Sequence, residues 1–440
     1  MFYILSSLGL LIIHAILYMG TKVNIFPELF VFPWLISKGL VPYRDFFDHH
    51  GVFLYYLLSL LSGDKSLTQT AIFYNVVQLV NLALVLGVLR KITSKFWYLI
   101  CGLLFILLNY YFSDGTFWFE HLFVLISLIT YVTSEFTASF RGKNILLGGL
   151  LFLDTLIKPT YGLLLIPYSI SRRSFKPGIS FAMLWLLYLG YLYLNRSLGI
   201  FLDSMFVFNA KAVGYIKDYY VFGIEPFIFN LIAVIAVVST VMYLLLGKMP
   251  RFFLLIVYIS FGYVLQGYTK INLLPFIPFF VFLIAYVGSG YSSKTRWMYF
   301  LLVVFLCLFC LYRVVKRQYI IGSKTNVPYI ESLHIRQCMD EIHNSKIPMN
   351  NSIYFDSPEY YYLLNQIPPS YYLLDLEFIT KYRIDYEKRI IQDLEKRKAN
   401  YVLLRSQNKR KNSLPTFAKF LSSDYSVLKV TECFSYFSRK

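Results

Sequence analysis

The densest group of ionisable side chains in the sequence lies in the stretch VPYRDFFDHHG, residues 41–51. It contains Arg44, Asp45, Asp48, His49 and His50, in a chain that is 57% hydrophobic with a mean hydropathy of +0.56. Carboxylates and imidazoles at this spacing could take a proton from an acceptor or hold a cation. An ordinary solvated loop would have the same composition, so both interpretations stay open at this point.

Isolated charged residues also mark the ends of long apolar runs. Glu120 and His121 begin one run, Lys158 lies between two runs, and Lys270 precedes another. A carboxylate at the mouth of an apolar helix is costly unless it faces a cavity or a partner. A lysine there can reach lipid headgroups or bind a phosphate as a point charge. These residues are either site candidates or simple markers of the water boundary.

The composition is typical of a polytopic membrane protein. Aromatic residues make up 19% of the chain and charged residues only 15%, whereas soluble domains carry about 25% charged residues. The formal net charge is +18, but the basic residues cluster in short breaks between apolar runs. That pattern indicates membrane topology and disfavours binding to nucleic acid.

A membrane-spanning helix needs about 20 mostly apolar residues. The first apolar run lacks a basic leader and a small-residue cleavage site, so we expect a retained helix there. Short apolar runs, separated only by Lys158 and Pro159, could form one broken hairpin. In all, eleven stretches qualify: 2–20, 71–90, 96–112, 119–134, 144–157, 160–171, 178–195, 225–246, 252–268, 271–289 and 297–315.

Lysine and arginine in the short loops predict the orientation, because cytoplasmic loops are enriched in them. Every second break is basic, which places the N-terminus in the cytoplasm and the region after about residue 315 outside. The outer side then holds residues 41–51, Glu120, Lys158 and Lys270. The basic residues on which this rests are Arg90, Lys91, Lys95, Arg141, Lys143, Arg172, Arg173, Lys176, Lys248, Arg251, Lys294 and Arg296.

We therefore expect an α-helical polytopic membrane domain over residues 1–315 and an extracytoplasmic α/β domain over residues 316–440. The first outer loop, about residues 21–70, has two apolar stretches, 30–36 and 52–61, which read as amphipathic helices lying in the membrane interface.

In the C-terminal domain the pattern predicts strands at 352–356 and 400–406 and helices at 357–366 and 387–399. Cys338 and Cys433 could form a disulfide if this part faces an oxidising space, but the sequence does not decide it.

Four segments together resemble the GT-C superfamily of membrane glycosyltransferases. They are GLVPYRDFFDHHGVFLYYL, EHLFVLISLI, LIKPTYGLLLIP and GYTKINLLPFIPFF. The similarity is greatest to the bacterial branch related to protein O-mannosyltransferases and the aminoarabinose transferase of lipid A. The sequence departs from the pattern at Val52, where proline is usual. It departs again at Lys270 and Asn272, where many relatives carry arginine and a His-Tyr pair.

The resemblance implies an inverting transferase in the plasma (inner) membrane. The sugar donor would be a polyprenyl-phosphate sugar, and the acceptor a glycan, lipid or protein. Asp45 would be the general base, and Arg44, Lys158 and Lys270 would stabilise the leaving phosphate. Asp48 and Glu120 would complete the catalytic site, shaping the acceptor pocket or binding a divalent cation such as Mg²⁺ or Mn²⁺. The neighbourhood of the acceptor or metal would include His49, His50 and His121.

Two other functions fit the composition. A transporter or flippase of lipid-linked sugars would place charges within broken membrane helices rather than at their outer ends. A non-catalytic membrane scaffold would need no charge at either Asp45 or Glu120.

Overall fold

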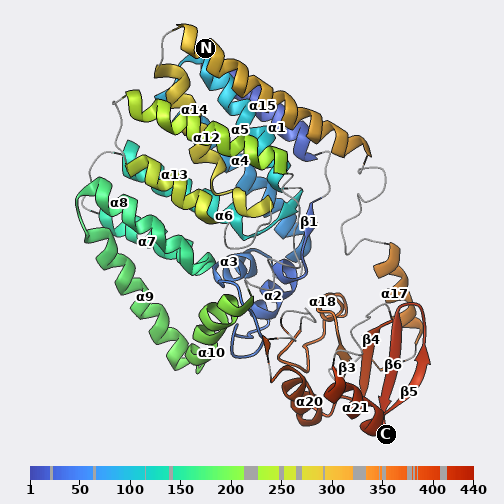
Figure 1. Cartoon of the computed structure of the whole chain (residues 1–440). Helices are drawn as coiled ribbons and strands as arrows, with labels where there is room; N and C mark the ends of the chain where they lie inside the picture. Colours follow the sequence, from blue (N-terminus) through green and yellow to red (C-terminus); the bar gives the residue numbers. More distant parts are fainter. Residues whose placement is uncertain are drawn as a thin grey trace. The chain divides into compact units, whose positions relative to one another are not determined.

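The computed structural model describes a mostly helical chain (Figure 1). The described residues are 1–19, 23–62, 66–113, 115–137, 142–212, 226–246, 252–263, 270–290, 293–320, 333–345, 347–348, 353–373, 379, 382–383, 385–406 and 414–440. Three of the basic loop residues used for the orientation, Arg141, Lys248 and Arg251, lie outside these ranges, as do the ends of several predicted stretches.

Within the described ranges, six helices are long and apolar enough to cross a membrane. They confirm six of the predicted stretches and establish the coarse class, a helical membrane protein. Many of their apolar side chains are exposed, for example Leu186 and Leu187, as a lipid-facing surface allows. The six helices are α4 (Ser66–Ile92), α5 (Lys95–Ser113), α6 (Phe119–Phe136), α9 (Lys176–Leu194), α12 (Pro226–Leu246) and α15 (Ser293–Ile320).

The other five predicted stretches form shorter elements. Between α6 and α9 the chain forms α7 (Lys143–Ile157), a 3-10 turn η2 (Pro159–Leu164) and α8 (Leu165–Arg172), so Pro159 does interrupt the apolar run. Proline removes a helical hydrogen bond and favours the first turn of a new helix, which explains the break. The remaining elements are α1 (Phe2–Met19), α13 (Phe252–Gly262), η5 (Lys270–Leu273) and α14 (Ile277–Gly290).

The chain divides into two compact units that differ from the predicted domains. Unit 1 comprises residues 1–24, 71–190 and 217–326, and unit 2 comprises residues 25–70, 191–216 and 327–440. The first outer loop therefore belongs with the C-terminal region rather than with the helical bundle. The predicted boundary near residue 315 falls within α15.

Unit 1 is a bundle whose inner helices approach closely. Gly288 on α14 faces the indole of Trp97 on α5, and a Cβ at Gly288 would lie 2.3 Å from that ring. The interior also holds a polar contact, in which Asn109 Nδ2 donates to Tyr18 Oη at 2.8 Å and to Gln78 Oε1 at 2.7 Å. Hydrogen bonds between polar side chains of this kind help to hold neighbouring helices together in a membrane.

In unit 2, the predicted loop helices form as α2 (Glu28–Ser37) and α3 (Phe53–Ser62). Every residue of α2 from Glu28 to Leu35 is buried. The phenyl ring of Phe32 packs against the rings of Phe46 and Tyr55. The expectation of an amphipathic helix lying on the membrane surface was therefore wrong for α2, because this helix has no polar face and is enclosed by other elements.

The C-terminal part of unit 2 contains a four-stranded sheet with the order β3-β4-β6-β5 (Figure 1). The strands are β3 (Ile353–Phe355), β4 (Tyr401–Arg405), β5 (Tyr425–Val430) and β6 (Phe434–Arg439). β3 and β4 are parallel, while the β5–β6 hairpin adds antiparallel pairs that the sequence pattern did not predict. The helices are α17 (Leu333–Asn344), α18 (Glu359–Leu363), α20 (Tyr386–Lys396) and α21 (Pro415–Asp424).

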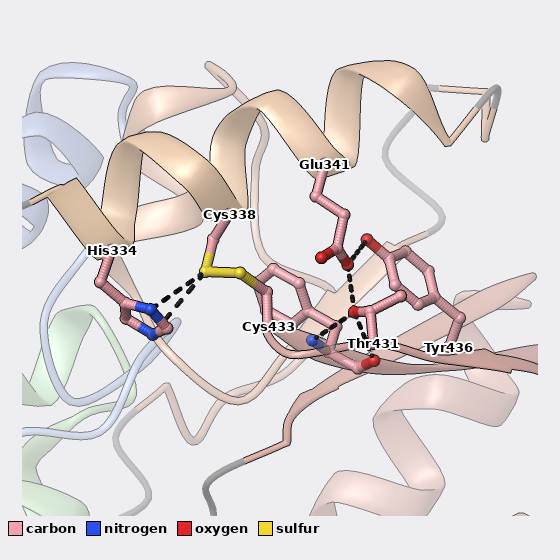
Figure 2. The surroundings of a disulfide bond; sticks show 7 residues. His334, Cys338, Glu341, Thr431, Cys433 and Tyr436 are labelled. Atoms are coloured by element: carbon pink, nitrogen blue, oxygen red, sulfur yellow. Dashed lines mark hydrogen bonds between the residues drawn. A yellow bond between two sulfur atoms is a disulfide. The ribbon is translucent and has the colours of Figure 1, made fainter.

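A disulfide joins Cys338 on α17 to Cys433 beside β6, which answers the question left open by the sequence (Figure 2). Next to it, Glu341 accepts hydrogen bonds from the hydroxyls of Thr431 and Tyr436, the latter at 2.6 Å. These contacts fix α17 on the sheet. Disulfides persist in oxidising compartments, in keeping with the predicted extracytoplasmic side.

Candidate functional site

Asp45 lies in a tight turn that its own side chain closes. Tyr43 has a positive φ of 66°, and the amides of Arg44 and Asp45 both donate to the carbonyl of Val41. Asp45 Oδ2 accepts from the Val41 amide at 2.7 Å, and both carboxylate oxygens accept from the Arg44 guanidinium at 3.0 and 2.7 Å. Partial burial acts to raise the pKa of Asp45, but these hydrogen bonds outweigh it and hold the pKa below its usual value.

Asp48, three residues further on, is in a different environment. Its side chain is fully buried. Asp48 Oδ1 accepts from the His49 amide at 2.8 Å and from Nδ1 of His50 at 3.0 Å. Burial is the main reason that the pKa of Asp48 is raised to about 6, although hydrogen bonds and His49 act in the opposite direction. A buried carboxylate that holds an imidazole is a common proton-transfer arrangement in enzymes.

Glu28, which the sequence interpretation passed over, belongs to the same region. It is the first residue of α2, is buried, and interacts electrostatically with Asp48 and with Glu359 on α18. Burial first, and these two like charges after it, raise the pKa of Glu28 to about 7. The sequence could have indicated Glu28 as a site candidate, because Glu28 lies at the start of an apolar helix just as Glu120 does.

The C-terminal region holds the first loop through backbone contacts. The Phe47 amide donates to the carbonyl of Tyr371 at 2.9 Å, and the Tyr371 hydroxyl donates to the carbonyl of Tyr43 at 3.2 Å. Arg383 forms an ion pair with Asp203 and lies over the rings of Phe47 and Phe208. Within unit 2, segments near residues 203–208, 371 and 383 thus pack together around the first loop at Tyr43 and Phe47.

The predicted residues Glu120 and Lys158 meet in unit 1. The Glu120 side chain is fully buried and forms a close ion pair with Lys158 Nζ, which retains 24% exposure. Lys158 Nζ also lies 3.5 Å from Asn272 Oδ1. Lys158 lies between α7 and η2, so the break in the apolar run is what brings its ammonium group to Glu120 on α6.

Lys270 and His121 have other neighbours in unit 1. Lys270 Nζ lies 4.9 Å from the centroid of the Tyr111 ring, a cation–π distance. His121 is buried, and its Nδ1 accepts a hydrogen bond from the Trp118 amide at 3.2 Å. Its ring packs edge-on against Tyr74. These contacts hold the His121 ring at the start of α6, and its predicted place near an acceptor or metal stays a prediction.

Asp48, His49 and His50 are also a possible metal site. Each offers one ligand atom, and these atoms lie within 4.8 Å of one another. One carboxylate with two imidazoles suits Mn²⁺, Fe²⁺ or Zn²⁺ better than Mg²⁺, which prefers oxygen ligands alone. The residues therefore fit one of the two cations suggested by the resemblance, Mn²⁺, and not the other.

The predicted site residues fall into two groups. The first-loop cluster, in unit 2, is Arg44, Asp45, Asp48, His49 and His50 together with Glu28. The membrane cluster, in unit 1, is Glu120, Lys158, Lys270 and Asn272. No protein-family model and no curated protein matches the chain, so the geometry of these clusters carries the functional argument.

Proposed function

We propose that the protein is a membrane glycosyltransferase that moves a sugar from a polyprenyl-phosphate donor to an acceptor outside the cytoplasm. The observation that carries this proposal is the hydrogen bond at 3.0 Å between buried Asp48 and the imidazole of His50. With Nδ1 donating to the carboxylate, the proton-accepting lone pair of the ring is on Nε2. This arrangement supports removal of a proton from an acceptor hydroxyl.

The reaction balances without a nucleotide or a redox partner. His50 takes the acceptor proton as the acceptor oxygen bonds to the anomeric carbon. The bond from that carbon to the phosphate oxygen breaks, and its electron pair leaves with the polyprenyl phosphate. Attack from the opposite face inverts the anomeric centre. Asp48 orients the imidazole and stabilises the imidazolium ion that forms.

The proposal assigns the base to the Asp48–His50 pair and gives Asp45 a different role. The hydrogen bonds that Asp45 accepts from Arg44 and Val41 favour its charged form, which makes it a weak base. Its turn sets the path of the chain into residues 46–50. The prediction that Lys158 and Lys270 bind a phosphate as point charges concerns unit 1 alone and is separate from this base.

A turnover assay with a matched pair of variants tests this function. The protein would be reconstituted in nanodiscs with polyprenyl-phosphate hexoses and a membrane extract as acceptor source. Mass spectrometry would then measure the released polyprenyl phosphate. We expect release by the wild-type protein, loss in Asp48→Asn and His50→Gln, and retention of most activity in Asp45→Asn. The proposal fails if the wild-type protein releases nothing from any donor, or if Asp48→Asn is fully active.

A flippase of lipid-linked sugars is the second candidate, and one observation favours it. Asp154 is fully buried within α7, four residues before the break at Lys158 and Pro159. Transporters place ionisable groups at broken helices in this way. Movement of a fluorescent lipid-linked sugar between leaflets, without release of polyprenyl phosphate, would support this function against the transferase.

A further inference from the structure

Buried oxygen atoms from four helical elements of unit 1 gather around Asp154. Ser127 lies on α6, Tyr168 on α8, and Tyr263 just beyond α13, and all three side chains are buried. The Ser127 hydroxyl is within hydrogen-bonding reach of the Asp154 carboxylate on α7, and Tyr168 and Tyr263 interact with it electrostatically. None of these residues belongs to the first-loop cluster or to the membrane cluster.

These oxygen atoms lack partners of normal geometry. Across the described residues, neither Asp154 carboxylate oxygen has a hydrogen bond that meets distance and angle limits, and the same holds for Ser127 Oγ, Tyr168 Oη and Tyr263 Oη. A buried polar atom without a partner costs about 1–3 kcal/mol. Several such atoms around one carboxylate therefore indicate a bound species that joins them.

The charge of Asp154 is also not balanced by the nearest cation along the chain. Lys158 is one helical turn away, but its ammonium group is paired with Glu120 and lies near Asn272. A proton on Asp154 would neutralise the carboxylate and satisfy one acceptor, yet it would leave the remaining hydroxyl oxygens without partners. A cation with several oxygen ligands satisfies the charge and the oxygens together.

The ligand chemistry selects the kind of cation. The candidate ligands are oxygen atoms only, which favours a hard ion over a transition metal. One carboxylate supplies a single negative charge, which balances a monovalent ion, whereas calcium sites usually contain several carboxylates. The break between α7 and η2 lies beside the site, and ends of interrupted helices coordinate Na⁺ in other membrane proteins.

We propose that Asp154, Ser127, Tyr168 and Tyr263 form a binding site for a monovalent cation, with Na⁺ as the probe ion, inside the helical bundle. The ion links α6, α7 and α8 to the end of α13, and so stabilises unit 1. This site is independent of sugar transfer and would be present in a transferase or a flippase.

Thermal unfolding of the purified full-length protein tests the site. NaCl, KCl and choline chloride would be compared at constant ionic strength in the same detergent. We expect a saturable rise in Tm with Na⁺ that choline does not produce, because an ion that binds only the folded state stabilises it. The Na⁺-dependent rise should vanish in Asp154→Asn.

Two further variants separate loss of the ion from general damage. Ser127→Ala removes one neutral ligand and should weaken Na⁺ binding about fivefold, while the Na⁺ response persists at higher concentration. Ser134→Ala is the matched control for Ser127→Ala, since Ser134 is another buried serine of α6 and its hydroxyl already donates to Glu135 Oε1 at 2.8 Å. Its Na⁺ response should equal that of the wild-type protein.

Equilibrium dialysis with radioactive ²²Na⁺ gives a readout that does not depend on unfolding. The wild-type protein should bind one ion that Ser127→Ala binds more weakly. Absence of both a Na⁺-specific Tm shift and bound ²²Na⁺ in the wild-type protein would overturn the proposal, and would leave a protonated Asp154 as the explanation. An undiminished Na⁺ response in a folded Asp154→Asn variant would also overturn it.

Discussion

The first-loop cluster and the membrane cluster each contain a fully buried carboxylate, but the two are neutralised differently. Asp48 accepts hydrogen bonds from a backbone amide and an imidazole, whereas Glu120 is paired with the ammonium group of Lys158. A neutral imidazole can both donate and accept a proton through its two ring nitrogens, whereas an ammonium group can only donate. The comparison indicates proton transfer at Asp48 and fixed charge placement at Glu120.

The two clusters also differ in how the chain is held around them. Contacts from Tyr371, Arg383 and the disulfide-linked C-terminal region enclose the first loop in unit 2. In unit 1, helices of a bundle position Glu120 and Lys158. Four predictions test this contrast, from the largest expected effect to the smallest.

The largest effect should come from the two aspartates of the first loop. Asp48→Asn should lower turnover about 10³-fold, within the range found for loss of a general base, because its amide cannot stabilise an imidazolium ion. Asp45→Asn should lower turnover less than about tenfold. Polyprenyl-phosphate release measures both. Equal losses in the two variants would remove the distinction between the residues.

Removal of the Cys338–Cys433 disulfide should destabilise the protein by about 4 kcal/mol, since the bond closes a loop with a sequence separation of 95. Hydrogen exchange of the double Cys→Ser variant should show the change in unit 2, around α17 and β6, with unit 1 unaffected. Equal loss of protection in both units would contradict the separate stabilisation of the C-terminal region.

Breaking the Glu120–Lys158 pair should destabilise unit 1 by about 3 kcal/mol. Lys158→Met leaves the buried Glu120 carboxylate without its cationic partner, and removing one partner of a buried ion pair is more costly than removing both. The double variant Glu120→Gln with Lys158→Met should recover most of this loss. Thermal unfolding of the single and double variants measures the coupling, and strictly additive effects would show that the two side chains act independently.

The smallest effect concerns pH and Asp45. Its pKa is lower in the folded protein than in the unfolded chain, so its stabilising contribution is present above the unfolded pKa of about 4 and is lost as the pH falls through the folded value. Between pH 5 and pH 3 the wild-type Tm should fall slightly more steeply than that of Asp45→Asn. Parallel curves would show that the Arg44 and Val41 hydrogen bonds do not stabilise the folded state.

The local sequence pattern was sufficient to predict those helices and strands whose burial follows from the residues next to them in the chain. Six long apolar runs became candidate spans, and the strands at 353–355 and 401–405 formed within the stretches 352–356 and 400–406 that the sequence predicted. The sequence pattern did not predict the burial of α2, because its eight buried residues are covered by other elements, the nearby α3 and the distant α18. The disulfide was likewise undecided, since sequence spacing does not give the distance between two cysteines.

The candidate site was also predictable from the sequence only in part. The sequence identified the charged stretch 41–51 and the residues Glu120 and Lys158, because ionisable groups in an apolar chain stand out. It ranked Asp45 above Asp48 through a family resemblance and passed over Glu28 and Asp154. The relative importance of these acidic residues depends on their burial and their hydrogen-bond partners, and neither can be read from the identity of a residue in the sequence.

By itself, therefore, the amino-acid sequence determined the membrane class and the places where charge interrupts apolar runs, since hydropathy and composition are local quantities. Only the tertiary structure decided which carboxylates are buried, which groups lie beside each of them and which cysteines are joined. Desolvation, ion pairing and disulfide formation all depend on distances between groups that are remote in sequence, and those distances exist only once the chain has folded.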